Sequence, residues 1–311
     1  MSGNTPRVAI RTPHALLPLF PQFLRRRRRG YGGVPALLRE TGLSRPALFL
    51  LVHVAEQGPA GGTIDSLRPG APYSTCDLHL GWLDEAIAGG FLERDPADHF
   101  HLTTSGTALV TRLETEATAS LAGLQPLPAA ELARLADEFA TIAAGLDEAA
   151  GGPEAHLRYA PRLAALAPAS AAAPLVRLER AIFALWLARD DAHIGAWQAA
   201  RFPAPHLAIL TQLWHGEVDS LAGLIVALGE THESATIAEL VEELGEQGYV
   251  EWRSGALQPT RAGYNVREAI ESDTDELYFR QWPPLDADTL NWLHDALVRL
   301  IAALPDEERP A

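Results

Sequence analysis

The amino-acid sequence predicts a mainly α-helical protein with small β wings, built from two copies of one unit. Apolar residues recur at helical spacing over most of the chain, and two short pairs of stretches read as strands around a turn. A segment of the first half also returns, in similar form, about 158 residues later. We therefore expect two tandem units with the same fold.

The repeat is clearest at residues 80–94 (LGWLDEAIAGGFLER) and 238–252 (AELVEELGEQGYVEW), where Gly90 aligns with Gly248. Further on, the LTTSG of residues 102–106 aligns with the PTRAG of residues 259–263, after a loop one residue shorter. Two amphipathic stretches then close the copies at Leu146 and Leu304. Because the spacing stays nearly constant across several elements, chance is a poor explanation and an internal duplication is expected.

Each copy reads as helices followed by a hairpin and another helix. The expected helices span 48–56 and 74–88, then 206–215 and 232–246, and the strands span 91–94 and 100–102, then 249–253 and 256–257. Ser74 and Ser234 are candidate helix starts, and a further helix is expected after Gly106 and after Gly263. Three helices, a two-stranded wing and a last helix make the winged variant of helix-turn-helix.

The domain boundaries follow from composition. Residues 1–148 form the first winged-helix unit with a basic N-terminal helix, and residues 149–174 are a linker rich in Ala, Pro and Gly. Residues 175–305 form the second unit and residues 306–311 a tail. We expect the flanking helices of both units to build a shared helical core with pseudo-twofold symmetry.

Composition restricts the function. The formal net charge is −15 and all 25 basic residues are arginine, yet residues 1–45 hold nine arginines and one acid. This asymmetry indicates a local basic site on an acidic body. One cysteine, Cys76, excludes an internal disulfide and fits a reducing compartment, and no apolar run reaches membrane-spanning length. We expect a cytoplasmic protein with no membrane contact.

Catalytic motifs are missing from the sequence. It contains no Gly-rich phosphate loop, G-x-S-x-G, H-E-x-x-H or C-x-x-C pattern. His99 and His101 would share one face of a strand, but without a firm third ligand they are expected to be wing surface rather than a metal site. Cys76 is expected to pack as a small buried residue, with a redox-sensing thiol as the alternative. We predict no enzyme activity, no cofactor and no metal.

The order of helix, G-[FY]-[LV]-E, turn, [LP]-T-x-x-G and long helix resembles the MarR-type winged-helix regulators. The stretch GLSRPAL at residues 42–48 is also similar to the start of that family's second helix. The resemblance covers residues 36–122 and, more weakly, 198–279. It implies double-stranded DNA as partner, a small apolar effector, and either a homodimer or, here, a monomeric pseudo-dimer of the two copies. The function expected from it is a DNA-binding transcriptional regulator.

The sequence departs from that family in its charges. The first wing, at residues 95–98, lacks the family's Asp-x-Arg arginine, and the second offers only Arg253. The segments in the recognition-helix position, residues 74–90 and 232–248, carry acids and no arginine. DNA affinity comes largely from neutralising phosphates, so acidic helices oppose it. The alternative is an acidic tandem winged-helix module that binds protein partners and does not read DNA.

The expected DNA contacts combine the arginine run, the wings and the helix starts: Arg25, Arg26, Arg27, Arg28, Arg29, Ser74, Thr75, Arg94, His232, Ser234 and Arg253. The run itself has two interpretations. It could contact phosphates across a glycine-rich hinge, or it could be a solvated helix end that pairs with acids or with the end of the C-terminal helix.

Aromatic residues suggest a ligand site in the second half, which holds all but one of the seven tryptophans. The segment RDDAHI at residues 189–194 places polar groups among them. Trp186, Asp190, His193 and Trp197 are therefore the candidate lining of an effector pocket. The alternative is ordinary core packing, which is the usual fate of aromatic residues at helical spacing.

Overall fold

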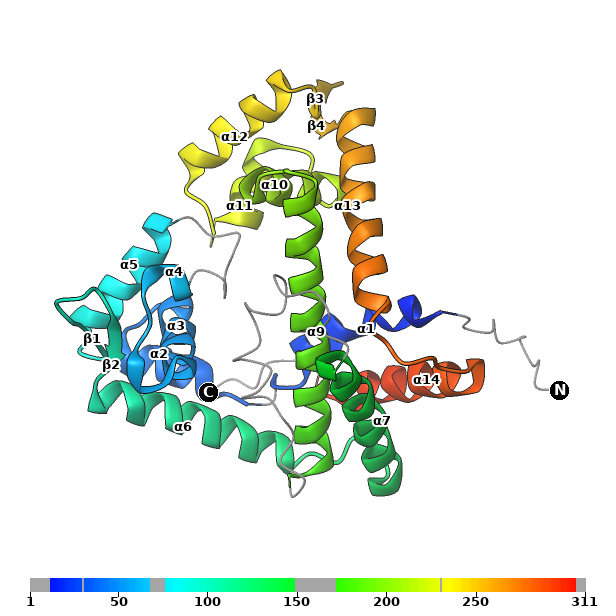
Figure 1. Ribbon diagram of the computed structural model, residues 1–311. Coiled ribbons are helices and arrows are strands. Elements are labelled where there is room, and N and C mark those ends of the chain that lie inside the picture. Colours follow the sequence, from blue (N-terminus) through cyan, green and yellow to red (C-terminus); the bar gives the residue numbers. More distant parts are fainter. Residues whose placement is uncertain (1–11, 30, 68–75, 149–171, 230, 306–311) are drawn as a thin grey trace.

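The computed structural model describes residues 12–29, 31–67, 76–148, 172–229 and 231–305. Within these ranges the protein is mainly α-helical, and its two β sheets are antiparallel hairpins of two strands each (Figure 1). The predicted class, α with small β wings, is confirmed. None of the described helices is long and apolar enough to cross a bilayer.

The first half runs through helices and one hairpin in this order: η1 Pro13–Leu16, α1 Leu19–Arg26, α2 Gly33–Thr41, α3 Arg45–Glu56, η2 Gly58–Ala60, α4 Ile64–Leu67, α5 Cys76–Ala88, β1 Leu92–Arg94, β2 Phe100–Leu102, α6 Thr104–Ala122 and α7 Ala129–Glu148. The second half contains α9 Pro174–Ala199, α10 Ala204–His215, α11 Leu221–Leu228, α12 Ser234–Glu246, β3 Val250–Arg253, β4 Ala256–Pro259, α13 Arg261–Phe279 and α14 Ala287–Ala303. From α3 and α10 onward the two halves follow the same order.

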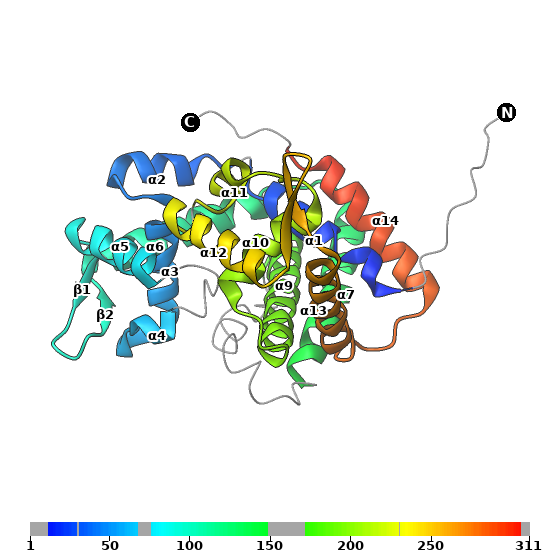
Figure 2. The same cartoon turned by 90° about the horizontal axis from the view of Figure 1, so that it is seen from above.

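Three hydrophobic clusters organise these elements. One lies inside the first winged unit and draws on residues 37–113, and a second lies inside the second unit with residues 196–270. The third joins η1, α1, α7, α9 and α14, so both halves contribute to it. Figure 1 shows the consequence: α9 stands at the centre, with one winged unit at the left and the other at the top. Seen from above, the hairpins β1–β2 and β3–β4 lie apart (Figure 2).

The junction between wing and long helix is built identically in the two units. Thr103 caps α6: its hydroxyl accepts from the Gly106 amide at 3.1 Å and donates to the Gly90 carbonyl at 2.8 Å. Thr260 repeats both bonds at the start of α13, at 3.2 and 2.6 Å. A threonine N-cap satisfies an amide that the first helical turn leaves without a partner. The T-x-x-G signal is therefore a helix cap that also ties the wing to its helix.

The glycine in the T-x-x-G signal is required at both positions for a steric reason. A Cβ on Gly106 would overlap the carbonyl oxygen of Phe91, and a Cβ on Gly263 would overlap that of Tyr249. The chain just before each wing therefore lies directly against the first turn of the long helix. Only glycine allows the backbones to approach so closely.

The two halves differ at their first helices. Buried residues of η1, α1 and α2 correspond to buried residues of α9 at a spacing of 159: Leu16 with Leu175, Leu19 with Leu178, Phe23 with Ile182, and Leu37 with Ala196. The second half carries them on one continuous helix. The first half breaks between Arg26 and Gly33, where the last three arginines of the run and a glycine-rich stretch replace the helical pattern.

Several sequence expectations need correction or fall outside the described residues. Helix α12 begins at Ser234, the expected start, with Glu233 in the N-cap position, so the expected range 232–246 is two residues too long at its N-terminal end. Cys76 is exposed at the start of α5 and not buried, because the buried face of that helix begins only at His79. Residues 149–171 of the expected linker, the tail 306–311, and Ser74 and Thr75 lie outside the described ranges.

Candidate functional site

The recognition position of the first unit is occupied by α5. His79, Leu83 and Ala86 face the core of the unit, which leaves Asp77 and Asp84 on the exposed face. A third acid, Glu85, is not available there, because its carboxylate accepts from the Ser44 hydroxyl at 2.7 Å and from the Ser44 amide. The acid thus fixes the start of α3 instead of facing a partner. The outer face of α5 is only moderately acidic.

The corresponding face of α12 is much more acidic. Ile237, Leu240, Val241 and Leu244 point into the second unit. The exposed face carries only carboxylates as charged groups within the helix and its N-cap: Glu233, Glu239, Glu242, Glu243 and Glu246. One of them, Glu243, contacts the imidazole of His206 at 2.8 Å. Such a face repels a phosphate backbone and attracts a basic surface.

Each wing offers one of the arginines predicted to contact DNA, and each arginine has a carboxylate beside it. Arg94 lies 3.1 Å from Asp98 and stacks over the ring of Phe100. Arg253 lies 2.7 Å from Glu251, and its side chain is 70% exposed. Exposed pairs of this kind are weak, so both guanidinium groups can exchange their partner for a phosphate.

The residues predicted at the helix starts are placed differently from one another. Ser234 is exposed as the first residue of α12. His232 is 1% exposed and contacts the Thr231 hydroxyl at 2.9 Å, and burial lowers its pKa. A buried neutral ring offers no surface to a duplex, so the structure argues against His232 as a contact.

The arginine run is held by the protein itself. Arg26 donates to the carbonyl oxygen of Ile301 at 3.1 Å, near the C-terminal end of α14. Arg27 and Arg28 both bind the carboxylate of Glu179 on α9. Arg28 does so with two hydrogen bonds, at 2.6 and 2.8 Å, which is the bidentate geometry of a strong pair. For these three residues the interpretation as a helix end paired with acids and helix carbonyls describes the structure.

Glu179 is the centre of this clamp. It is 5% exposed on the otherwise apolar face of α9. Burial alone would raise its pKa, but the hydrogen bond and charge of Arg28 and the charge of Arg27 hold the pKa of Glu179 below its usual range. Burial in turn lowers the pKa of Arg27, against the opposing effect of Glu179. A buried carboxylate between two guanidinium groups depends on both of them for its charge.

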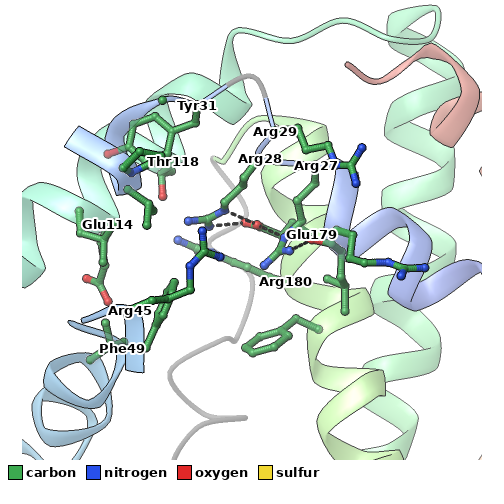
Figure 3. Close-up of a pocket in the computed structure, with 18 of the residues that line it drawn as sticks. Arg27, Arg28, Arg29, Tyr31, Arg45, Phe49, Glu114, Thr118, Glu179 and Arg180 are labelled. Carbon is green, nitrogen blue, oxygen red and sulfur yellow. Dashed lines mark hydrogen bonds and ion pairs between the residues drawn. The ribbon is translucent and has the colours of Figure 1, made fainter. Parts of the chain in front are cut away.

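A cavity of about 670 Å³ opens beside the clamp, between the first winged unit and α9. Arginines line it from the end of α1 and the following turn, from α3 and from α9. In Figure 3 the side chains of Arg28, Arg45 and Arg180 point toward one another from these three elements. The walls of the cavity also include the rings of Phe49 and Phe183. The cavity therefore combines apolar surface with an excess of positive charge.

The residues predicted to line an effector pocket lie further along α9. Trp186 packs against the shared core and Trp197 against the core of the second unit. His193 contacts the Thr274 hydroxyl at 2.9 Å, and burial followed by the charge of Arg267 lowers its pKa to about 4. Neither these residues nor Asp190 lines the arginine-rich cavity. Both tryptophans therefore pack against core residues.

The sequence analysis missed four residues that shape the cavity: Arg45, Phe49, Glu179 and Arg180. One signal was available for Glu179. It interrupts an apolar face of α9 formed by Leu175, Leu178 and Ile182, and a charge there requires a partner. No local pattern identifies that partner, because Arg28 lies 151 residues away in the sequence.

Comparison with known proteins adds one match. The model of a family described as "Helix-turn-helix family" matches residues 100–309, which is more than half of the chain. The matched region begins at β2 and includes the whole of the second winged unit and α14. No curated protein and no solved structure matches the chain.

Proposed function

The chain belongs to the helix-turn-helix family, and from this premise we propose that it is a DNA-binding transcriptional regulator of MarR-like type. We further propose that it arose by internal duplication, so that one chain supplies both winged units of a pseudo-dimer. The main observation in support is the same helix-turn-helix, wing and capped long helix in both halves. Its DNA affinity is proposed to respond to a small ligand.

The two units are proposed to contribute unequally. Helix α5 exposes Asp77 and Asp84, whereas α12 and its N-cap expose five glutamates. Since each carboxylate near the duplex opposes phosphate binding, the first unit is the better DNA reader. Within the proposal, Arg94 contacts the backbone, together with Ser74 and Thr75, which lie outside the described residues. Ser234 and Arg253 of the second unit contribute less.

A second candidate function is supported by the second unit alone. Its exposed surface combines the acids of α12 with two large apolar side chains, Trp252 at 59% exposed and Val226 at 86% exposed. Exposed aromatic groups beside charge are typical of surfaces that bind proteins. In this version the unit binds a basic protein partner and does not read DNA.

Fluorescence anisotropy tests the first proposal. The full chain is titrated onto a labelled duplex from the region upstream of its own gene, over a salt series. We expect affinity to fall linearly with the logarithm of salt concentration, and Arg94→Ala to reduce the slope by about 0.9. Arg253→Ala is expected to change the slope less. Arg280→Ala, at the exposed C-terminal end of α13, is the matched control and should leave it unchanged.

The arginine run is unsuitable for this test, because Arg26, Arg27 and Arg28 hold the fold together. Absence of binding to any duplex at low salt would overturn the regulator proposal. Recovery of a basic protein in a pull-down that depends on Glu239, Glu242 and Glu246 would then support the second candidate.

A further inference from the structure

The wing of the first unit carries two histidines, one in the turn before β2 and one on β2 itself. The hairpin β1–β2 lies at the outer edge of the molecule, away from α9, in both views (Figures 1 and 2). Both imidazole rings face one carboxylate, that of Asp95. The Nε2 atom of His101 lies 3.2 Å from it, and the Nδ1 atom of His99 lies 3.7 Å from it. The two ring centroids are 6.3 Å apart, so two titratable rings share one acid in this wing.

The shared acid is held in place and stays ionised. The Asp95 carboxylate accepts hydrogen bonds from the backbone amides of Ala97 and His99, at 2.8 and 2.9 Å, and thereby closes the turn between the strands. The bond from the His99 amide is the largest of the effects that hold the pKa of Asp95 below its usual range. Protons that this cluster takes up near neutral pH therefore go to the imidazoles and not to the carboxylate.

The two rings differ in how they are held. The ring of His101 lies against the backbone of Gly61, where an added Cβ would come within 2.5 Å of the ring, and the side chain is 27% exposed. The side chain of His99 is 39% exposed. Because its Nδ1 atom faces Asp95, its Nε2 atom points away from that carboxylate. A protonated His99 can therefore donate to a bound phosphate, whereas His101 contributes charge from a fixed position.

Among the described residues, Asp95 is the only carboxylate within 4 Å of either ring. The glycine-rich segment 58–63 and the first turn of α6 contain no charged side chain, and the charged residues of α6 begin at Arg112, about two turns further on. The other titratable groups on the surrounding elements are Arg45, His53 and Glu56 on α3, Asp65 on α4, and Cys76, Asp77, His79, Asp84 and Glu85 on α5. Asp95 is thus the acid that sets the local charge around both rings.

Protonation of both rings would bring the net charge of this wing from −2 to zero. Besides the two histidines, residues 93–101 carry three acids and one arginine, namely Glu93, Asp95, Asp98 and Arg94. An excess of carboxylates opposes a phosphate backbone, and two protons remove that excess. The second wing, residues 251–258, has one acid, one arginine and no histidine. Of the two wings, the first is therefore the one whose charge changes near neutral pH.

We propose that the first wing is a proton-dependent contact for the phosphate backbone of duplex DNA. His99 and His101 each take up one proton from solvent as the pH falls, and the added charge strengthens the contact made by Arg94. This inference rests on the proposed function, because it describes the regulation of the same interface. The signal is acid, and the response needs no small ligand.

The sign of the pH dependence follows from linkage. A nearby phosphate favours the charged form of an imidazole, so the complex binds more protons than the free chain does. Affinity should therefore rise as the pH falls through the range in which histidine titrates, from about pH 8 to about pH 6. Each charged ring that neutralises a phosphate also releases a counterion. The slope of log affinity against log salt concentration should then steepen by about 0.9 for each ring.

Fluorescence anisotropy with the labelled duplex, at pH 8 and pH 6 and constant ionic strength, tests the proposal. We expect the wild type to gain about fivefold in affinity at pH 6 for each of the two histidines. His99→Gln and His101→Gln should each lose one of these gains, and the double variant should lose both. At pH 8, where the rings are neutral, all four proteins should bind equally.

Acid also reduces the negative charge of the whole chain, so a matched control is needed. His215→Gln changes an exposed histidine at the last residue of α10, in the second unit, and should leave the pH dependence of affinity as it is. Calorimetric titration in two buffers of different ionisation enthalpy counts the protons taken up on binding. Near pH 7 the wild type should take up more protons than the double variant.

Urea unfolding at both pH values shows whether the variants keep the fold. His99 is joined to Asp95 by its backbone amide, and His99→Gln keeps that bond. This variant should therefore fold like the wild type, and it suffices for the test if His101→Gln is unstable.

The inference is overturned if the variants keep the wild-type pH dependence, or if the wild type binds equally at pH 6 and pH 8. In both cases the duplex is still bound and the proposed function stands. Absence of binding at both pH values overturns the regulator proposal, and the inference with it.

Discussion

The two halves of the molecule begin differently and then become the same. In the second half one long helix, α9, runs from the shared core to the second winged unit. In the first half the equivalent segment breaks after Arg26, and the arginines of the break bind Glu179 of α9. The comparison teaches that two halves with matching hydrophobic positions can differ by one charged site, which is placed where a helix is interrupted.

The halves also differ in the charge of their recognition helices. The wing junctions are equivalent in each hydrogen bond, whereas the exposed faces of α5 and α12 are not. Residues that hold the fold together are thus the same in both units, whereas the charges on the exposed helix faces differ. This pattern is expected when one unit keeps a binding role that the other has lost or changed.

The largest expected effect is at the clamp. Glu179→Ala would remove the buried carboxylate and leave the half-buried guanidinium groups of Arg27 and Arg28 near each other without that counterion. Removing one partner of a buried pair typically destabilises a protein by about 3–5 kcal/mol. Urea unfolding of the full chain measures this.

Glu276→Ala is the matched control for the clamp, because Glu276 forms an exposed pair with Arg280 on α13. It should change the free energy of unfolding by less than about 1 kcal/mol. Equal stability of the Glu179 and Glu276 variants would mean that the break is not held by its ion pairs, and the contrast with α9 would lose its physical basis.

The next effect tests the equivalence of the two wing junctions. Gly106→Ala and Gly263→Ala each place a Cβ against a carbonyl oxygen, of Phe91 in one unit and Tyr249 in the other. Relieving such an overlap requires the backbone to shift, so each variant should lose about 1–3 kcal/mol of stability. The two losses are expected to agree closely in thermal or urea unfolding. A harmless substitution at one site and a severe one at the other would break the equivalence.

A third effect depends on pH and distinguishes the two halves at one position. His193 on α9 corresponds, at the spacing of 159, to Val34 of α2. Burial, followed by the charge of Arg267, lowers the pKa of His193 from its ordinary value of 6.5 to about 4. The unfolded chain therefore binds a proton that the folded chain does not, and stability falls as pH decreases from 6.5 toward 4. The slope from this group is at most about 1.4 kcal/mol per pH unit.

His193→Gln removes that contribution while keeping a side chain that can reach Thr274. The difference between the two urea-unfolding curves, measured from pH 7 to pH 4, isolates His193 from the other histidines. Parallel pH profiles for the two proteins would show that the His193 ring takes up its proton over the same pH range in the folded and the unfolded chain. The ring would then not be buried as described.

The sequence predicts the repeated part of this molecule well and the unique part poorly. The helix order, the T-x-x-G caps and the glycines before each wing are local patterns, and each has a backbone reason confirmed at Thr103 and Thr260. The cavity has no local pattern, because its residues come from five helices, α1, α2, α3, α6 and α9, that are spread over the chain. His232 shows the same limit: its position near a helix start suggests exposure, but packing of the second unit buries it.

The smallest expected effect sharpens the comparison of the recognition helices. Gly81 lies on the exposed side of α5 and Gly245 in the last turn of α12, and a Cβ on either would meet nothing within 4 Å. Alanine should therefore stabilise each helix by about 0.4–1 kcal/mol in urea unfolding. A glycine lowers the stability of a helix, and no neighbouring atom requires glycine at these two positions. Such a glycine can instead allow a ligand to come close to the helix backbone. If α5 reads DNA, Gly81→Ala will gain stability and lose duplex affinity in anisotropy, whereas Gly245→Ala will gain stability alone. Unchanged affinity in both would remove α5 from the duplex interface and leave the two helices with no functional difference beyond their charge.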